Sequence, residues 1–558
     1  MKKLIAGLVC SVAGMLTAQD MSAGATAVEQ AVVAELSDAD IARIKAKLAE
    51  RPLLSNEIGA YWQGNIYPYE DLNGVVRLGR TPVRHSRDVK KSGLGIGYET
   101  LDRYAFDPGW TFKPIGETGV KWARCQTGWV RCEKEKGVYD FAWLDEVVDG
   151  LAAEGVETWF SVSYGNHLYT QCGKFERELA EAKATGGVAP GWARGCVGEG
   201  PVYHGEEAVE GWKRYVRAMA RHFKGRVRVW EIWNEPEGFW RDQFEIAGRK
   251  YGVAKAAQDF AGFMRLTAAV IREEIPTARI SFNLAALSSG WVPVLAKAGI
   301  GEFIDIFNYH GYEPYPEAAL DAMHAQVRAL FRRPDGTPLE IWQGESGRSA
   351  GKSPDGICLP TQYSQARFIP RRVVSDLFHG AKVSSIYTVT DHPNTQPTRT
   401  ASMYGVLNLD TRKPRHAWYT LQCLGWLCDG LEPAPENFVY FATRTNKEFT
   451  DHLPYAAVKT ASFRRNGVPV LAVWQPQHVE LNTRPLCGCI RFVIGDSIGE
   501  IRHPVMIDPV RCEVWDVASL FADRPSDVRL TKLGIETVNP FYALDYPLFI
   551  TDISIFDK

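Results

Sequence analysis

The stretch RVRVWEIWNEPEGFW, residues 226–240, determines how the rest of this chain is interpreted. Residues 227–233 crowd β-branched and aromatic side chains together, which is typical of a strand that is buried on both faces. Pro236 should end that strand because it has no backbone N–H, and it favours an extended backbone at Glu235, the residue before it. We therefore expect Glu235 at the carboxyl end of a buried parallel strand, where a β/α barrel carries its chemistry.

Between residues 93 and 418, strand-like runs alternate with amphipathic helical segments. Trp212, Val216 and Met219 share one helical face, and Gly225 should end that helix. A second helix is predicted over residues 254–274. Parallel strands need such helical crossovers, so the pattern predicts an α/β fold, a (β/α)8 TIM barrel. Its strands are expected at residues 94–98, 120–125, 157–162, 227–233, 278–284, 303–309, 339–343 and 383–389.

The segments on both sides of the barrel read differently. After residue 418, short strand-like runs separated by turn residues predict an accessory β-sandwich domain over residues 419–558. These runs are at residues 438–441, 456–458, 468–474, 490–494, 512–515 and 548–555. Residues 26–92 contain a helix that Ser37 should cap, followed by short strands. We expect this segment to complete the side domain rather than the barrel.

Two glutamate motifs resemble those of a known group of enzymes. The Trp-Asn-Glu-Pro run at residues 233–236 resembles the acid/base motif of clan A glycoside hydrolases, and LEIWQGESG at residues 339–347 resembles their nucleophile strand. The resemblance extends over residues 93–418. In detail the chain is most similar to family 39, through GYETLDR, GVKWARCQTGW, EKGVYDFAWLDEVVDGL and SYGNHLYT. The resemblance implies that Glu235 is the acid/base and Glu345 the nucleophile of a retaining glycoside hydrolase.

Retaining hydrolysis needs two carboxyl groups about 5 Å apart, one to protonate the leaving oxygen and one to attack the anomeric carbon. Glu235 and Glu345 end the fourth and seventh predicted strands, and strand ends of a closed barrel converge on one rim. We expect burial and the neighbouring negative charge to keep Glu235 protonated, and hydrogen-bond donors to keep Glu345 ionised.

The resemblance also implies a set of supporting residues. Asn234 should bind the sugar 2-hydroxyl, and Arg124 at the end of the second strand should hold the nucleophile ionised. Further contacts with the sugar are expected from Asn166, His167, His310, Tyr312, Trp129 and Glu99. Many clan members have a tryptophan platform at the end of the eighth strand, whereas residues 388–392 contain no tryptophan. The identity of the sugar therefore stays open.

The composition excludes several other classes of protein. A formal net charge of −2 gives no electrostatic footprint for nucleic acid. Residues 1–25, with Lys2 and Lys3 before an apolar run, are typical of a signal peptide, so we expect an exported, periplasmic or extracellular protein without membrane insertion after cleavage.

Cys172 and Cys196 are the first candidate disulfide pair. Neither a metal site nor a cofactor is predicted, because the spacing of Cys487 and Cys489 lacks further ligands.

The predicted function is that of a retaining, exo-acting glycosidase on plant, algal or host glycans, with an oligosaccharide or polysaccharide as its partner. The alternatives are an endo-acting clan A glycanase and a non-catalytic carbohydrate-binding protein. The oligomeric state stays open.

Overall fold

The structure is a computed structural model of the 558-residue chain. It describes residues 36–54, 67–70, 72–170, 180–181, 184–185, 196–240, 252–285, 287–351, 362–392, 403–434, 439–443, 458–477, 488–495, 501–522, 534–537 and 541–557. The predicted signal peptide, together with Cys172 and Cys487, lies outside these residues.

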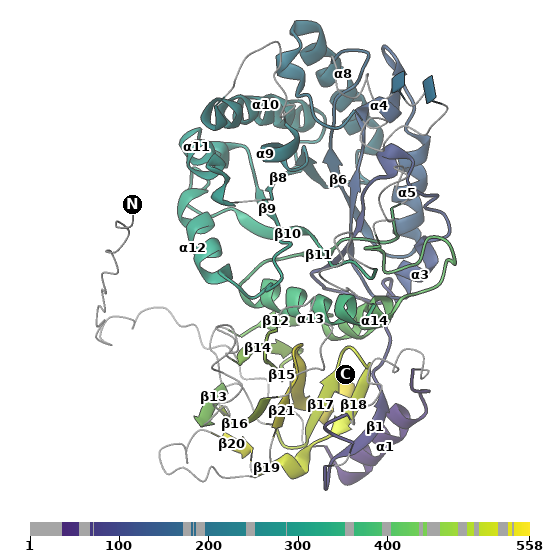
Figure 1. The fold of residues 1–558 in the computed structure, drawn as a ribbon, viewed down its shortest axis with the longest axis vertical. Coiled ribbons are helices and arrows are strands. Elements are labelled where there is room, and N and C mark those ends of the chain that lie inside the picture. The colour runs from purple at the N-terminus through teal and green to yellow at the C-terminus, as the bar shows by residue number, and fades with distance from the viewer. Residues whose placement is uncertain are drawn as a thin grey trace, which may run out of the picture.

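A closed parallel barrel forms the upper part of the molecule (Figure 1). Its strands are β2 (Leu94–Tyr98), β3 (Trp122–Gln126), β6 (Glu157–Val162), β7 (Val229–Ile232), β8 (Arg279–Leu284), β9 (Ile306–His310), β10 (Glu340–Ser346) and β11 (Ser384–Ile386). They follow one another around the barrel in chain order, and β11 closes it against β2 through the pairing of Ser384 with Leu94. Each strand overlaps one of the eight predicted runs, so the TIM barrel is confirmed.

Helices cover the outside of the barrel (Figure 1). They are α3 (Phe112–Gly116), α4 (Trp129–Cys132), α5 (Ala142–Ala153), α8 (Glu206–Phe223), α9 (Pro236–Phe239), α10 (Val253–Glu274), α11 (Trp291–Lys297), α12 (Leu320–Leu330), α13 (Gln362–Phe378) and α14 (His416–Leu427). A short hairpin of β4 (Glu133–Glu135) and β5 (Val138–Tyr139) follows α4. In α8, the predicted apolar face of Trp212, Val216 and Met219 is buried because it packs on the barrel core.

Two antiparallel sheets form a second domain below the barrel (Figure 1). The larger contains β1 (Val76–Arg80), β18 (Glu513–Asp516), β17 (Pro504–Asp508), β22 (Leu548–Asp552), β15 (Val468–Trp474), β14 (Lys459–Arg465) and β12 (Leu431–Pro433). The smaller contains β13 (Val439–Thr443), β16 (Gly488–Gly495), β20 (Gly534–Thr537), β19 (Phe521–Ala522) and β21 (Phe541–Ala543). Side chains of both sheets, such as Leu471 and Ile494, share one hydrophobic core, so the accessory sandwich is confirmed.

The structure describes only the last residue of one predicted strand of this domain. Residues 456–457 of the run at 456–458 lie outside the described residues, and the strand begins after Val458, at Lys459. The strand is the alternating segment that pairs along its whole length with β15, from Lys459 opposite Trp474 to Arg465 opposite Val468. Its charged ends concealed it in the sequence.

The N-terminal segment joins the second domain. Helix α1 (Asp38–Ala49) begins at Ser37, whose side chain accepts a hydrogen bond from the backbone N–H of Asp40. Ile44 and Leu48 of this helix are buried. Strand β1 pairs antiparallel with β18, from Val76 opposite Asp516 to Arg80 opposite Glu513. The beginning and the end of the chain therefore share one sheet.

In the part of the chain that the structure describes, no helix is both long and apolar enough to cross a membrane. Cys196 is disulfide-bonded.

Candidate active site

Glu235 stands on a sharp turn at the carboxyl end of β7. Its backbone is left-handed, with φ +44°, and the nearby Trp233 has φ +68°, so the expected extended backbone at Glu235 was wrong. Pro236 excludes the right-handed helical region for the residue before it, but it also occupies the first position of α9. The chain must reverse between β7 and α9 within these few residues, and the left-handed conformation achieves this. The side-chain oxygen of Asn283 fixes the turn by accepting from the Glu235 N–H at 2.7 Å.

Glu345 lies within β10 and is held by two donors. Arg124 Nη1 donates to its Oε2 at 2.9 Å, and the Tyr312 hydroxyl donates to its Oε1 at 2.6 Å. Both donors favour the ionised carboxylate that a nucleophile requires. Arg124 was expected beside Glu345 and contacts it, whereas Tyr312 was expected as a sugar contact and here donates to the carboxylate of Glu345.

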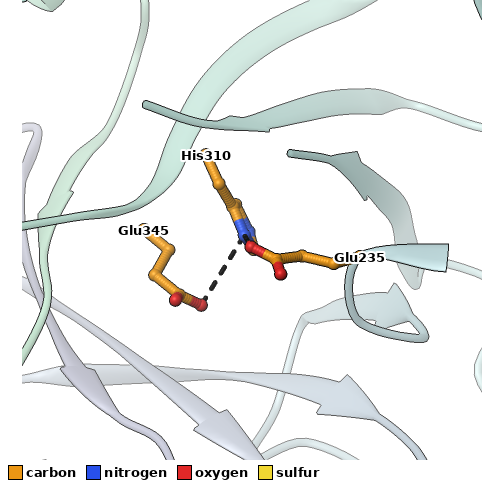
Figure 2. A group of neighbouring side chains, drawn as sticks. All are labelled: Glu235, His310 and Glu345. Carbon is orange, nitrogen blue, oxygen red and sulfur yellow. Dashed lines mark hydrogen bonds and ion pairs between the residues drawn. The ribbon is translucent and has the colours of Figure 1, made fainter. Parts of the chain in front are cut away.

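Glu235, His310 and Glu345 converge from different strand ends of the barrel (Figure 2). One side-chain donor or acceptor atom from each lies within 4.8 Å of the other two. His310 Nδ1 is 2.8 Å from Glu235 Oε1 and 3.6 Å from Glu345 Oε2. Such a carboxyl separation suits a retaining glycosidase, because inverting enzymes place the groups about 6.5–9.5 Å apart to admit a water molecule.

The protonation of Glu235 differs from the expectation. Burial raises its pKa, but the hydrogen bond and the charge of His310, together with the charge of Arg124, outweigh burial, so the net pKa is below its usual value. For His310, burial lowers the pKa, whereas the charge of Glu345 and the hydrogen bond to Glu235 raise it above its usual value. In the unliganded protein the proton of this pair therefore resides mainly on His310.

Arg124 is the centre of a buried network beneath the two carboxylates. Its Nε donates to Glu231 Oε1 at 3.1 Å, and its Nη2 donates to Asn234 Oδ1 at 2.8 Å. Its Nη1 also reaches Glu99 Oε1 at 3.3 Å. Asn283 and Asn308 donate their side-chain N–H groups to the two oxygens of Glu231.

Glu231, Asn283 and Asn308 were not predicted as site residues. All three are fully buried within barrel strands. The sequence did carry a signal, because a glutamate between Trp230 and Ile232 in a strand buried on both faces needs internal partners. Asparagines in the apolar runs of the two following strands supply them.

A cavity of about 510 Å³ opens over the carboxylates. It is lined by Glu235, Ala285, His310, Tyr312, Glu313, Glu345, Tyr387 and Tyr404. Tyr387 directly follows β11, and its ring centroid lies 5.5 Å from that of Tyr404 and 6.1 Å from that of Tyr312. The aromatic wall that the sequence lacked at residues 388–392 is thus formed by tyrosines, one of them on the strand end itself.

Several predicted sugar contacts lie elsewhere. Asn166 uses its amide within its own loop, donating to Glu133 O at 2.8 Å and accepting from Leu168 N at 2.9 Å. Trp129 is fully buried and stacks on Tyr169 with ring centroids 4.9 Å apart, because the loop after β3 turns it toward α8. Neither residue lines the cavity.

The remaining predicted contacts divide between the surface and the layer below the cavity. His167 is exposed and is not part of the cavity wall. Glu99 and Asn234 are buried beneath the wall, on Arg124. Asn234 also donates to the Tyr164 hydroxyl at 2.7 Å, so both ends of its amide have partners inside the protein.

Among the described residues, one group of histidine and carboxylate side chains is close enough to hold a cation, namely Glu235, His310 and Glu345. A cation there would have to compete with Arg124 and Tyr312 for the oxygens of Glu345. The arrangement therefore suits acid/base and nucleophilic chemistry better than metal binding.

Comparisons with known proteins agree with this geometry. The model of glycoside hydrolase family 42, described as beta-galactosidase, matches residues 111–245, a segment that contains Glu235. Among curated proteins, none matches the sequence.

Solved structures share the fold. A family 39 glycoside hydrolase from the gut symbiont Bacteroides cellulosilyticus WH2 superimposes with a TM-score of 0.56 and 14% identity, covering 85% of this chain and 83% of that one. A family 30 subfamily 8 xylanase from Clostridium acetobutylicum gives a TM-score of 0.44 and 12% identity over 85% of this chain and 97% of its own. The likeness to the family 39 structure shows that the chain shares the barrel fold of that glycoside hydrolase. It agrees with the resemblance to clan A glycoside hydrolases that the sequence motifs carry.

Proposed function

We propose that the protein is a retaining, exo-acting glycosidase that cleaves its substrate by double displacement. The observation that carries the proposal is the closeness of Glu235 and Glu345, whose nearest oxygens lie within 4.8 Å, on strand ends of one barrel. The different partners of the two carboxyl groups support different roles for them.

In the first displacement, Glu345 attacks the anomeric carbon while Glu235 protonates the departing oxygen. Arg124 and Tyr312 orient the nucleophile. The Glu235 side chain is 20% exposed in the unliganded protein. A sugar in the cavity removes that water, and further burial favours the protonated carboxyl, which receives its proton from His310 across their 2.8 Å contact.

In the second displacement, Glu235 acts as a base. It takes a proton from a water molecule, the water oxygen attacks the anomeric carbon, and Glu345 leaves as a carboxylate. The anomeric configuration is retained because it is inverted twice.

The exo-acting mode is supported by the size of the cavity. Among the described residues, the cavity has a volume of about 510 Å³, within the range of small-ligand pockets, about 300–1,000 Å³, which suits a short terminal segment of a glycan. An endo-acting glycanase is the second candidate. Chain-length analysis of the products from a polysaccharide separates the two, since an exo-enzyme releases only the terminal unit.

The first test is a panel of aryl glycosides that covers β-xyloside, β-galactoside, β-glucoside, α-L-arabinoside and α-L-iduronide. Glu235→Gln and Glu345→Gln should each lower kcat by at least about a hundredfold, because each removes a group that acts in the transition state. Azide should restore turnover in Glu345→Gly, which leaves a cavity for it. Wild-type turnover in either glutamine variant would contradict the assignment, and ligand-induced tryptophan fluorescence without released sugar would indicate a carbohydrate-binding protein.

We also propose that the protein is exported, on the strength of the basic and apolar pattern of residues 1–25. N-terminal sequencing of the protein recovered outside the cytoplasm should begin near residue 26. A protein that retains Met1 would contradict export by this signal.

A further inference from the structure

Glu99 is a buried carboxyl group for which the double displacement has no role. It follows β2 directly, and its side chain is 1% exposed. It does not line the cavity. Its Oε1 lies 3.3 Å from Arg124 Nη1, the same nitrogen that donates to Glu345 at 2.9 Å. Glu99 and the nucleophile therefore share one donor.

The charges around Arg124 do not balance if every carboxyl group is ionised. One guanidinium faces the three carboxyl groups of Glu99, Glu231 and Glu345. Glu231 has donors on both oxygens, from Arg124, Asn283 and Asn308, and Glu345 has Arg124 and Tyr312. Glu99 has the longest contact with Arg124 of the three. An extra proton in this network is thus best placed on Glu99.

The Thr388 hydroxyl provides the acceptor for such a proton. Its Oγ1 lies 2.8 Å from the Gly97 carbonyl oxygen and 3.1 Å from Glu99 Oε2. A hydroxyl has one proton, so Thr388 can donate it to only one of these two oxygens, and the shorter distance favours Gly97. The contact between Thr388 and Glu99 is then a hydrogen bond only if Glu99 is protonated and donates.

The electrostatic surroundings agree with this geometry. Burial and the negative charge of Glu345 raise the pKa of Glu99 to about 7, against the opposing effect of Arg124. The other titratable groups that face it are Cys125 and Tyr387, which are neutral near this pH because burial raises the pKa of each.

We propose that Glu99 is a positioning residue that holds a proton while the second displacement occurs, so that the charge of Arg124 is left to Glu345 as that carboxylate departs. The inference rests on the proposed function. In the glycosyl-enzyme, Glu345 is a neutral ester, and it regains its negative charge when water attacks. An ionised Glu99 would oppose that charge through the shared Arg124. The first displacement has no such penalty, since Glu345 loses its charge there.

The two displacements should therefore respond differently to pH. The test uses a dinitrophenyl glycoside of the sugar that proves to be the substrate. Dinitrophenolate leaves without acid assistance, so the second displacement limits kcat and a burst of dinitrophenolate appears. In the glycosyl-enzyme the neutral ester no longer raises the pKa of Glu99, so the ionisation that governs kcat lies below the pKa of about 7 in the free protein. As pH rises from about 5 to about 8, wild-type kcat should fall about tenfold, as one pKa unit of mutual interaction implies. KM should fall with it, because the intermediate accumulates, whereas kcat/KM should not follow this ionisation.

Glu99→Gln carries the neutral side chain at every pH, so its kcat should lose this alkaline fall. Glu133→Gln is the matched control, because Glu133 is equally buried but bonds to Trp129 and Tyr169. It should keep the wild-type profile. If the alkaline fall of kcat persists in Glu99→Gln, another group such as His310 causes it and the inference is overturned. A wild-type kcat that does not change with pH would also overturn the inference.

A measurement that needs no turnover separates this inference from the proposed function. The infrared difference spectrum between about pH 6 and about pH 8 should show the loss of a protonated carboxyl band in wild type and in Glu133→Gln but not in Glu99→Gln. Without that band the inference fails, whatever the activity. If the band is present but no glycoside is hydrolysed, the proposed function fails instead, and with it the role of the proton.

Discussion

Arg124 shows how one buried side chain organises the site. All five of its N–H groups face acceptors inside the protein, and its side chain is fully buried. Removing one partner from a buried ionic network leaves the others uncompensated, which costs about 3–5 kcal/mol.

Arg124→Met should therefore lower the free energy of unfolding by about 3–5 kcal/mol. The loss should be larger at about pH 8 than at about pH 5, because Glu99, whose pKa is raised to about 7, is charged only at the higher pH. Urea denaturation at both pH values measures it. Equal losses at the two pH values would show that packing rather than charge accounts for the effect.

In the proposed mechanism, His310 sets the acid limb of the second displacement. Its hydrogen bond and charge, together with the charge of Arg124, lower the pKa of Glu235 against burial. In His310→Gln the charge is gone, so the Glu235 pKa should rise and the base should be lost at a higher pH.

The acid limb of kcat for a dinitrophenyl glycoside should thus move upward in pH by about one unit, the usual scale of such interactions. The pKa of His310 is raised in the folded wild-type protein above its value of about 6.5 in the unfolded chain. His310 therefore stabilises the fold at pH values below about 6.5, and this stability is lost as pH rises through the pKa of the folded state. An acid limb that stays in place would mean that His310 does not control Glu235.

The two glutamates could be located from the sequence because each stands near the carboxyl end of an apolar strand-like run, in a motif that resembles one of a known enzyme family. Glu231 and Tyr404 could not, for different reasons. A glutamate inside an apolar strand is recognised as an Arg124 partner only once the barrel brings β3 and β7 together. Tyr404 reaches the cavity from a segment between β11 and α14, whose course no local pattern predicts.

At the scale of elements, the barrel strands were predictable because each is an apolar run followed by a loop and a helix, and burial on both faces enforces that composition. The strands of the second domain were harder to predict from the sequence. Strand β14 begins with Lys459 and ends with Arg465, and β17 begins with Pro504, so their ends resemble loops. Pairing with neighbours, rather than local composition, makes them strands.

Helix packing gives a test at the same scale. Gly425 in α14 lies against the loop before β3, where an added Cβ would come within 1.9 Å of the Thr118 carbonyl oxygen. Gly262 in α10 is exposed, and an added Cβ there would meet nothing within 4 Å.

Gly425→Ala should destabilise the protein by about 1–3 kcal/mol through overpacking. Gly262→Ala should stabilise it by up to about 1 kcal/mol, because alanine favours the helix. Thermal denaturation of the pair checks both. Equal effects would show that helix propensity, and not the contact between α14 and the barrel loop, governs these positions.

At the scale of the whole molecule, α13 joins the barrel to the second domain (Figure 1). Arg367 pairs with Asp545, and both side chains are at most 2% exposed. Arg371 donates to the Gln477 carbonyl at 2.6 Å and to Glu317, which also accepts from Trp474 Nε1 of β15 at 2.8 Å. The two domains are therefore joined by charges that are inaccessible to water.

Asp545→Ala should lower the free energy of unfolding by about 3–5 kcal/mol, because it leaves Arg367 buried without its carboxylate. Glu302→Ala is the control. It removes an ion pair with Arg265 in which the side chains are 52% and 59% exposed, and it should change stability by less than about 1 kcal/mol. Similar effects of the two substitutions in calorimetry would rule out a buried ionic joint between the domains.

The pairing of β1 with β18 has a consequence for how the protein is made. Val76 leaves the ribosome long before Asp516, its partner across the sheet, has been synthesised. The barrel strands between them all find their neighbours earlier. If the barrel forms during synthesis, the N-terminal strand must therefore wait with its edge unpaired, and closure of the second domain is the last step. A chaperone that binds extended chains would have its longest opportunity at this strand.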